Sequence, residues 1–368
     1  MQKGINIIIS GGGTGGHIFP AIAIAQALKR INPNTNVLFV GAEGKIEERK
    51  VPEAGFEIKL LNISGFQRKI SIENVKNIFR LLLSLIKSRK IIRKFKPDVV
   101  VGVGGYASGP LVFSATRKGI PALIQEQNSY PGITNKILAK RVNKICVAYD
   151  KMERFFPSEK IIRTGNPVRK KIVDTSATKE EVLSFFNLEK DKKVILSLGG
   201  SGGAKSINDS IKLNINKIAK KDIYFIWQTG KNYFETCNEA VEKSGATNIK
   251  VYDFISRMDL AFKAACVVIS RAGAGTISEL ELLGKASILV PSPNVAEDHQ
   301  TKNAMSLVNS NAAILVSDKD AKKRLIDEAL NLIEDNEKLE LLSNNISKIK
   351  MINSDMKIAE GVLKLASK

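Results

Sequence analysis

The residues best suited to chemistry stand at the end of a glycine run near the start of the chain. Residues 11–16 read GGGTGG and are followed directly by His17, one of 2 histidines in the sequence. Glycines without Cβ atoms let a backbone approach a ligand closely, and a helix N-terminus favours negative charge. Because an imidazole can move a proton near neutral pH, we predict that His17 is catalytic rather than structural.

A second candidate site lies at residues 270–279, which read SRAGAGTISE. The segment leaves an apolar run, crosses small residues and begins a helix. A diphosphate would lie against the N–H groups of Ala274, Gly275 and Thr276, and Glu279 could accept hydrogen bonds from ribose hydroxyls. A plain tight turn, with Glu279 placed for the helix dipole, explains the same pattern equally well.

Three further motifs resemble known sites less closely. Residues 11–16 fit the dinucleotide fingerprint, but the acid expected after the second strand is missing and Glu43 stands slightly beyond it, so an NAD site is a weak alternative. Residues 199–206 approach a Walker A loop, but Ala204 replaces its second glycine, which argues against ATP hydrolysis. Residues 318–320 (DKD) imitate a metal-binding DxD, yet acids there favour a cap of the next helix.

The elements that must position these residues alternate between strands and helices. A strand at 5–9 precedes the first glycine loop and a helix at 17–28; a strand at 194–198, a glycine loop at 199–203 and a helix at 204–218 repeat this order. The sequence therefore predicts an α/β fold with two Rossmann-like domains facing each other across a cleft. Further strands are predicted at 37–40, 56–61, 98–101, 122–124, 144–148, 160–163, 224–228, 249–252, 267–270, 287–290 and 314–316.

Length and composition agree with two domains. The 368 residues can form two cores, which we place at 1–165 and 166–350, with a final helix in 351–368 packing back on the first domain. The 3 cysteines are isolated, which excludes a disulfide framework and fits a reducing cytoplasm. Neither a basic leader nor an uninterrupted spanning apolar run is found, so we expect neither secretion nor a membrane-spanning helix.

The net charge of +20 is concentrated in the first half. Residues 1–165 carry 27 Lys and Arg against 11 Asp and Glu, whereas residues 166–368 carry 30 against 26. Such a half could meet nucleic acid, an anionic membrane or a polyphosphate, or could simply be a solvated basic surface. With 6 Tyr and 1 Trp and no recognisable nucleic-acid module, a nucleic-acid-binding protein is the weaker alternative.

A long helix predicted at 72–94 has more apolar residues than one sheet face needs. Basic residues flank its stripe, so the helix is either packed in the core with solvated lysines or presents an apolar patch, ringed by cations, to an anionic bilayer. The membrane-facing candidates are Ile72, Val75, Phe79, Leu82 and Leu83 with Lys69, Arg80, Lys87 and Lys90.

Seven motifs in order resemble the MurG family of peptidoglycan N-acetylglucosaminyltransferases. They are GGGTGGHIFPA at 11–21, GVGGYASGP at 102–110, QEQNSYPGITN at 125–135, GNPVR at 165–169, GGSGGA at 199–204, SRAGAGTISE at 270–279 and EDHQTKNA at 297–304. The resemblance implies a GT-B fold, with UDP-GlcNAc held mainly by the second domain. It also implies that lipid I, the undecaprenyl-diphosphate-linked MurNAc-pentapeptide, meets the first domain at the cytoplasmic face of the membrane, to which the protein is peripheral.

The resemblance also implies roles for individual residues. In the donor site Ser201 and Arg169 would contact the phosphates, the backbone of Phe254-Ile255 the uracil, Glu279 the ribose and Gln300 the sugar hydroxyls. Thr14, Gly15, Gly16 and Asn128 would complete the UDP-GlcNAc site from the acceptor side, and Gly104, Gly105 and Tyr106 would bind the acceptor. Family members often have His where this chain has Gln125, and Gln where it has His299, so a catalytic duty at 125 is in doubt.

The reaction implied is an inverting transfer of GlcNAc to the C4 hydroxyl of MurNAc, which forms lipid II. His17 is the preferred general base and Glu126 its rival. We expect no tightly bound cofactor and no protein metal site, although a divalent cation could stimulate the reaction, and we expect no nucleic-acid partner. A two-domain nicotinamide or flavin oxidoreductase is the alternative enzyme.

Overall fold

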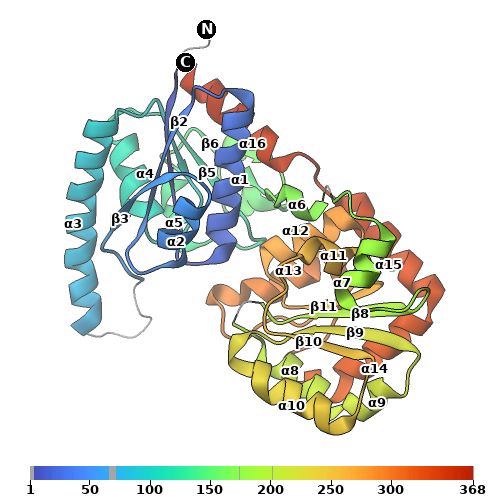
Figure 1. Ribbon diagram of the computed structural model, residues 1–368. Helices are drawn as coiled ribbons and strands as arrows, with labels where there is room; N and C mark the ends of the chain where they lie inside the picture. Colours follow the sequence, from blue (N-terminus) through green and yellow to red (C-terminus); the bar gives the residue numbers. More distant parts are fainter. Residues whose placement is uncertain (1–3, 66–71, 174, 201, 368) are drawn as a thin grey trace. The chain divides into compact units, whose positions relative to one another are not determined.

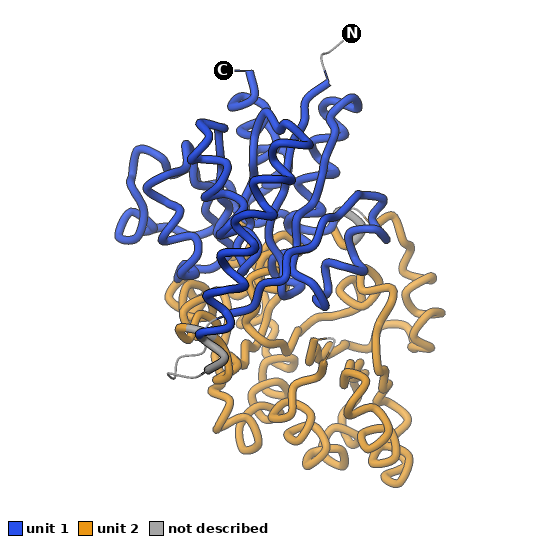
Figure 2. The backbone as a smooth tube through the Cα atoms, turned by 90° about the vertical axis from the view of Figure 1, so that its left-hand side faces the viewer, with its two compact units in different colours: residues 1–169, 351–368 blue, residues 170–350 orange. Residues whose placement is uncertain are grey.

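The chain forms two compact units. The computed structural model describes residues 4–65, 72–173, 175–200 and 202–367 (Figure 1). Unit 1 comprises residues 1–169 and 351–368, and unit 2 comprises residues 170–350 (Figure 2). The division falls after Arg169, four residues beyond the predicted end of the first domain at Gly165, because Asn166 belongs to unit 1. Its buried amide accepts a hydrogen bond from Gln125 and donates one to the carbonyl of Gln127.

Unit 1 is built on a seven-stranded parallel sheet in the order β3-β2-β1-β4-β5-β6-β7. Every strand predicted in this half is present, with ends displaced by at most two residues. The strands are β1 Asn6–Ser10, β2 Asn36–Ala42, β3 Glu57–Leu61, β4 Val99–Gly102, β5 Ala122–Glu126, β6 Lys144–Val147 and β7 Ile161–Arg163.

Helices cover both faces of this sheet, because successive strand residues point to opposite sides. Ile7 and Ile9 of β1 join a buried cluster with α1 and α16, whereas Ile8 joins a cluster with α4 on the other face. Arg30 of α1 forms an ion pair with Asp355 of α16, which fixes the C-terminal helix to unit 1. The helices are α1 Gly15–Ile31, α2 Ile46–Glu53, α3 Ile72–Phe95, α4 Ser108–Thr116, α5 Ile133–Leu138 and α16 Ser354–Ala366, with 3-10 turns η1 Met152–Arg154 and η2 Ser158–Lys160.

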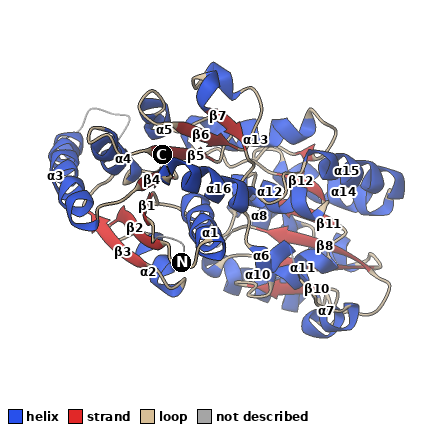
Figure 3. Ribbon diagram, turned by 90° about the horizontal axis from the view of Figure 1, so that it is seen from above, coloured by secondary structure: helices blue, strands red, loops and turns tan. Residues whose placement is uncertain are grey.

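Unit 2 repeats the plan with a six-stranded parallel sheet in the order β10-β9-β8-β11-β12-β13. Its strands are β8 Lys193–Leu198, β9 Ile223–Gln228, β10 Ile249–Tyr252, β11 Val267–Ser270, β12 Ala286–Leu289 and β13 Ile314–Leu315. Strands and flanking helices can be followed in Figure 3. Buried clusters on both faces, one around Trp227 and one around Phe262, show that this sheet too is covered on two sides.

The helices of unit 2 differ from the prediction in one place. The single helix expected at 204–218 is two, α8 Lys205–Leu213 and α9 Ile215–Ala219. Asn214 separates them, and its side-chain amide donates to the carbonyl of Ser210, offering the backbone an alternative partner. The remaining elements are α6 Lys170–Val173, α7 Lys179–Phe186, η3 Lys231–Tyr233, α10 Phe234–Ser244, α11 Met258–Ala264, α12 Ala274–Leu283, η4 Ala296–Asp298, α13 His299–Val308, α14 Ala321–Glu334 and α15 Asn336–Ile349.

Candidate active site

In each unit the loops singled out in the sequence leave the sheet where the strand order reverses. The loops after β1 and β4 are neighbours in unit 1, and the loops after β8 and β11 are neighbours in unit 2. Open parallel sheets bind ligands at the carboxyl ends of the strands at this reversal. The fold therefore brings the predicted glycine motifs together in pairs, within each unit, at the edge suited to a ligand.

His17 lies in the first turn of α1, beside the β1 loop. Its Nδ1 atom is 3.0 Å from the carbonyl oxygen of Gly12 and 3.1 Å from the hydroxyl of Thr14, the N-cap residue. A carbonyl oxygen can only accept, so the hydrogen bond to Gly12 requires a proton on Nδ1, and in the neutral ring the lone pair is then on Nε2. The other ring edge faces Gly104, where an added Cβ would lie 3.0 Å from Nε2. His17 thus presents a basic nitrogen between the two loops.

The loops after β1 and β4 touch through backbone atoms. A Cβ added to Gly105, at φ +81°, would lie 2.3 Å from the carbonyl oxygen of Gly12, so no side chain fits there. Gly104 and Gly105 therefore support the loop that carries His17, in addition to any contact with an acceptor. Tyr106, the third predicted acceptor residue, is half exposed at the start of the next turn. Gly15 and Gly16 form the first residues of α1 itself.

Sequence reasoning missed Glu47, which lies in the first turn of α2. Its side chain is fully buried, and its carboxylate accepts hydrogen bonds from the backbone N–H groups of Gly13, at 3.0 and 2.9 Å, and Ala42, at 3.0 Å. An internal anion therefore occupies the donors that a bound pyrophosphate would need, which weakens the NAD alternative. Glu43, the ribose candidate of that alternative, instead faces Lys87 at 3.5 Å. No local sequence pattern pairs Glu47 with a loop 34 residues away.

Glu126, the rival base, is buried at the end of β5. One carboxylate oxygen accepts from the backbone and side-chain amides of Asn128, at 3.0 and 3.3 Å. The other accepts from Gly132 N, at 3.2 Å, and Asn135 Nδ2, at 2.8 Å. Burial raises the pKa of Glu126 above its ordinary value, although these hydrogen bonds oppose the shift. The four hydrogen bonds that Glu126 accepts fix the segment 126–135. This segment includes Asn128, which is predicted to contact UDP-GlcNAc.

The anion seat predicted in unit 2 coincides with the N-terminus of α12, and its role stays a prediction. The N-cap residue is Gly273, which has no side chain of its own to cap the N–H groups of Ala274, Gly275 and Thr276. Glu279 follows one turn later and is partly exposed. A helix N-terminus with its N–H groups uncapped and an acid one turn inside can hold a phosphate and a neighbouring diol.

Arg271, in the motif but without a predicted role, ties the loops of unit 2 together. Its guanidinium donates to Asp318 and to the carbonyls of Val290, at 3.1 Å, and Pro291, at 3.2 Å. Ser206 also donates to Asp318. Asp318 is thus engaged by a cation and a hydroxyl, and in the described part of the chain no three His, Cys, Asp or Glu gather as a metal would require. That the DKD segment holds no metal stays a prediction.

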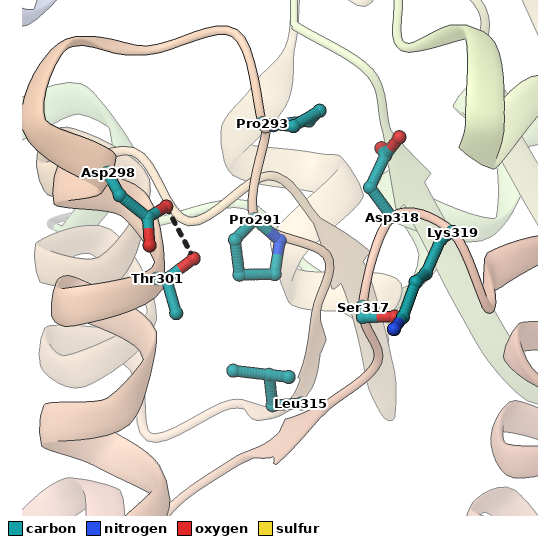
Figure 4. Close-up of a pocket in the computed structure, with 8 residues that line it drawn as sticks. All are labelled: Pro291, Pro293, Asp298, Thr301, Leu315, Ser317, Asp318 and Lys319. Atoms are coloured by element: carbon teal, nitrogen blue, oxygen red, sulfur yellow. Dashed lines mark hydrogen bonds between the residues drawn. The ribbon is translucent and has the colours of Figure 1, made fainter.

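Two adjoining pockets open at this edge of unit 2. The larger, of about 630 Å³, is lined by the α8 start, Arg271 and Gln300, and the smaller, of about 330 Å³, lies between the β12–α13 and β13–α14 loops. Figure 4 shows the smaller one, with Asp298 accepting from Thr301 on one wall and Asp318 and Lys319 on the other. Pro293, Asp318 and Lys319 line both pockets. The two pockets therefore share one wall.

Two residues predicted to bind UDP-GlcNAc already make hydrogen bonds within unit 2. The backbone N–H of Ile255 donates to Gln228 Oε1 at 2.9 Å, so its carbonyl is the group left for a base. Gln300 Oε1 accepts from Ser292 N at 2.9 Å, which directs the Nε2 donors of Gln300 outward. Phe254, beside Ile255, is 54% exposed and has room to cover a ring.

Arg169 and Ser201 are the remaining residues predicted to bind the phosphates of UDP-GlcNAc. Arg169 ends the first segment of unit 1, and its guanidinium lies 5.4 Å from the ring centroid of Phe19. Ser201 lies outside the described residues. Both stay predictions for phosphate contacts.

Helix α3 presents its apolar residues to the outside. Val75, Ile78, Phe79, Leu82, Leu83 and Ile86, here called the α3 apolar face, are each at least half exposed. The opposite side is buried and combines polar contacts with apolar packing. Asn77 donates to the carbonyl of Gly65 and Ser84 to that of Asn62, while Leu81 and Ile92 pack on the core. The alternative that this stripe packs in the core is therefore wrong.

The basic fringe of α3 is only partly available. Arg80 donates to Asn77 and Ser64, so it is held against the unit, while Lys87 and Lys90 are exposed. Lys69 lies outside the described residues, as does the side chain of Ile72. In the described ranges no helix combines the length and hydrophobicity needed to cross a bilayer.

Comparison with known families identifies both halves of the chain. The glycosyltransferase family 28 N-terminal domain matches residues 7–147, and the family 28 C-terminal domain matches residues 194–358. The UDP-N-acetylglucosamine–N-acetylmuramyl-(pentapeptide) pyrophosphoryl-undecaprenol N-acetylglucosamine transferase of Parabacteroides distasonis is 53% identical, over 100% of both chains. The transferase of the same name from Phocaeicola vulgatus is also 53% identical, over 100% of this chain and 98% of the relative.

Solved structures agree with the sequence comparison. The crystal structure of Acinetobacter baumannii MurG matches with a TM-score of 0.77 and 26% identity, over 98% of this chain and 99% of that one. The predicted GT-B fold of two Rossmann-like domains is thereby confirmed. Because the relatives match along their whole length at high identity, the chain belongs to the MurG family of N-acetylglucosamine transferases, within glycosyltransferase family 28.

Proposed function

We propose that this chain is the hexosyltransferase that moves GlcNAc from UDP-GlcNAc to the C4 hydroxyl of MurNAc in lipid I, forming lipid II for peptidoglycan synthesis. The observation that carries this proposal is the 53% identity over full length to transferases named for that reaction. Two features of the structure support it: a helix N-terminus with a glycine N-cap in unit 2, which suits a diphosphate, and the imidazole of His17 beside the glycine loops of unit 1.

The donor is assigned to unit 2. Its diphosphate would lie on the N–H groups at the start of α12, and Glu279 would accept from the ribose hydroxyls. The carbonyl of Ile255 would accept from the uracil ring N–H, since its own N–H is used by Gln228. Gln300 would donate to GlcNAc hydroxyls, because Ser292 already occupies its oxygen. These contacts recognise the base, ribose, phosphate and sugar separately.

The acceptor and the proton transfer are assigned to unit 1. The C4 hydroxyl attacks the anomeric carbon of the α-linked donor, the bond from that carbon to the phosphate oxygen breaks, and the hydroxyl proton passes to Nε2 of His17. The product is a β-1,4 linkage, and UDP leaves as an anion stabilised by the α12 N-terminus. Glu126 is less suited to be the base, because four hydrogen-bond donors already occupy its carboxylate.

Attachment to the cytoplasmic face of the membrane is assigned to the α3 apolar face. An undecaprenyl chain holds the acceptor in the bilayer, so unit 1 has to reach the membrane surface. Half-exposed aliphatic and aromatic side chains with Lys87 and Lys90 beside them suit peripheral binding to anionic lipid.

Incubation of the purified chain with radiolabelled UDP-GlcNAc and a water-soluble lipid I analogue tests the proposed function. We expect a labelled β-1,4 disaccharide and loss of the product when the C4 hydroxyl is blocked. UDP-GalNAc is the matched donor control. Absence of a disaccharide from folded protein that binds UDP-GlcNAc would contradict the proposal.

A further inference from the structure

The buried carboxylate of Glu47 and the ring of His17 bind opposite ends of one peptide group. Gly12 supplies its carbonyl oxygen, which accepts from His17 Nδ1 at 3.0 Å. Gly13 supplies its N–H, which donates to both oxygens of Glu47, at 3.0 and 2.9 Å. Hydrogen bonds in such a chain polarise one another, because a carboxylate on the N–H side makes the carbonyl oxygen a stronger acceptor.

The loop is shaped to admit this carboxylate. Gly12 has φ +143°, and a Cβ added there would lie 2.1 Å from Glu47 Oε1, so any other residue would displace the carboxylate. The Ala42 N–H, at 3.0 Å, holds the same oxygen from the end of β2. Glu47 is 0% exposed, and the three hydrogen bonds described here all come from backbone N–H groups. It is therefore a fixed internal anion rather than a solvated surface acid.

We propose that Glu47 is a positioning residue for the transfer reaction, acting on His17 through the Gly12–Gly13 peptide. It fixes the plane of that peptide, and the peptide carbonyl fixes the imidazole as its Nδ1–H tautomer, with the lone pair of Nε2 directed to the side of Gly104. A carboxylate hydrogen-bonded directly to a catalytic histidine fixes the tautomer and orientation of the ring. Here Glu47 would do the same through one intervening peptide group. The inference rests on the proposed function, in which His17 accepts the acceptor proton.

The ring tautomer of His17 tests the proposal directly, and it can be measured because the chain has few histidines. His17 and His299 are the 2 histidines of the chain, so ¹⁵N-labelled imidazole gives two sets of signals that His299→Ala assigns. We expect neutral His17 in the wild-type chain to be mainly the Nδ1–H form. A mainly Nε2–H form would overturn the proposal, and this measurement needs no variant at the site.

Glu47→Gln removes the charge while keeping the shape. We expect the Nδ1–H population of His17 to fall and kcat to drop by about 10–100-fold, while the KM for UDP-GlcNAc stays unchanged. Losses of this size are typical for residues that orient a functional side chain without contacting the substrate. His299 signals serve as the internal control. A folded Glu47→Gln variant with the wild-type tautomer and turnover would overturn the proposal.

Glu48→Gln is the matched control. Glu48 is the next residue on α2, is exposed, and also binds a glycine N–H, that of Gly44 at 2.8 Å, outside the His17 loop. It should retain wild-type turnover and tautomer. A merely structural role for Glu47 would lower stability without changing the ring tautomer of the folded molecules.

The two proposals fail differently. If wild-type and Glu48→Gln proteins make no disaccharide, the proposed function fails while the tautomer still reports on Glu47. If they do make it, and Glu47→Gln also behaves as wild type in both assays, the positioning role alone fails.

Discussion

Replacing three large residues of the α3 apolar face with glutamine should release the protein from membranes without unfolding it. Phe79, Leu82 and Leu83 are 64%, 52% and 65% exposed, so between about half and two thirds of each side chain remains to be buried by lipid. Full burial of such a side chain is worth about 1.5–3 kcal/mol, which leaves about 1–2 kcal/mol each for the membrane. The triple variant should therefore lose about 3–5 kcal/mol of binding, or roughly 10²–10⁴-fold in affinity.

Folding stability separates this expectation from a core role. Glutamine has nearly the helix propensity of leucine, and exposed substitutions usually change the free energy of unfolding by less than about 0.5 kcal/mol each. Co-sedimentation with anionic and neutral vesicles at rising salt measures binding, and urea unfolding measures stability. Leu213→Gln, which alters a 69% exposed leucine of unit 2, is the matched control and should bind as wild type.

Charge should contribute separately. Lys87→Glu with Lys90→Glu should weaken binding to anionic vesicles by at least about 1 kcal/mol per residue, and the loss should shrink at high salt. Turnover on a water-soluble acceptor should survive in both sets of variants. Wild-type vesicle binding by the folded glutamine variant would refute the assignment of α3, and its unfolding would show that exposure had been misjudged.

Three further changes test the site. Glu279→Ala should raise the donor KM by about 10–150-fold, corresponding to about 1.5–3 kcal/mol for hydrogen bonds to a charged group, with kcat little changed in steady-state assays. His17→Ala should lower kcat by about 10²–10⁴-fold while donor binding measured by calorimetry stays intact; near-wild-type turnover would exclude it as the base. Glu126→Gln should remove a pH dependence of stability. Because the folded-state pKa of Glu126 is raised, the folded wild type binds the extra proton and loses stability as pH rises above about 4.3. Urea unfolding at several pH values should therefore show that the free energy of unfolding of the variant rises relative to that of the wild type as the pH rises. Parallel plots of the two free energies against pH would contradict this.

Regular structure was predictable because it depends on short-range patterns. Apolar runs ending in glycine or polar loops located the strands of both sheets to within two residues, since most of these strands are buried parallel strands that need an apolar segment. The break between α8 and α9 was missed, because Asn214 can accept a helical position or bond back to Ser210, and only packing decides. The division between the units lies four residues beyond the predicted boundary, and Asn166 contacts unit 1 through Gln125, a partner 41 residues away in the sequence.

The site was predictable where chemistry and loop position coincide, as at His17 and the α12 N-terminus. It was not predictable where a role depends on contacts distant in sequence. Glu47 lies 34 residues from the peptide it binds, and Asp318 lies 47 residues from Arg271. A glutamate in the first turn of a helix usually serves the helix dipole, so the residue type gave no reason to place Glu47 in another loop.

Helix α3 shows why its outward face could not be chosen from its hydrophobic content alone. The stripe is as apolar as a core stripe, but the other side carries side chains that hold specific partners: Asn77 bonds to Gly65 and Ser64, and Ser84 bonds to Asn62. Turning the helix over would bury the apolar face, but it would break these bonds and expose Leu81, Ile91 and Ile92, which pack on the core of unit 1. The helix is therefore fixed by its buried side, and the apolar face left in solvent is the kind of patch that marks a protein or membrane contact. For an enzyme whose acceptor is anchored in lipid, we propose that the bilayer surface covers this face.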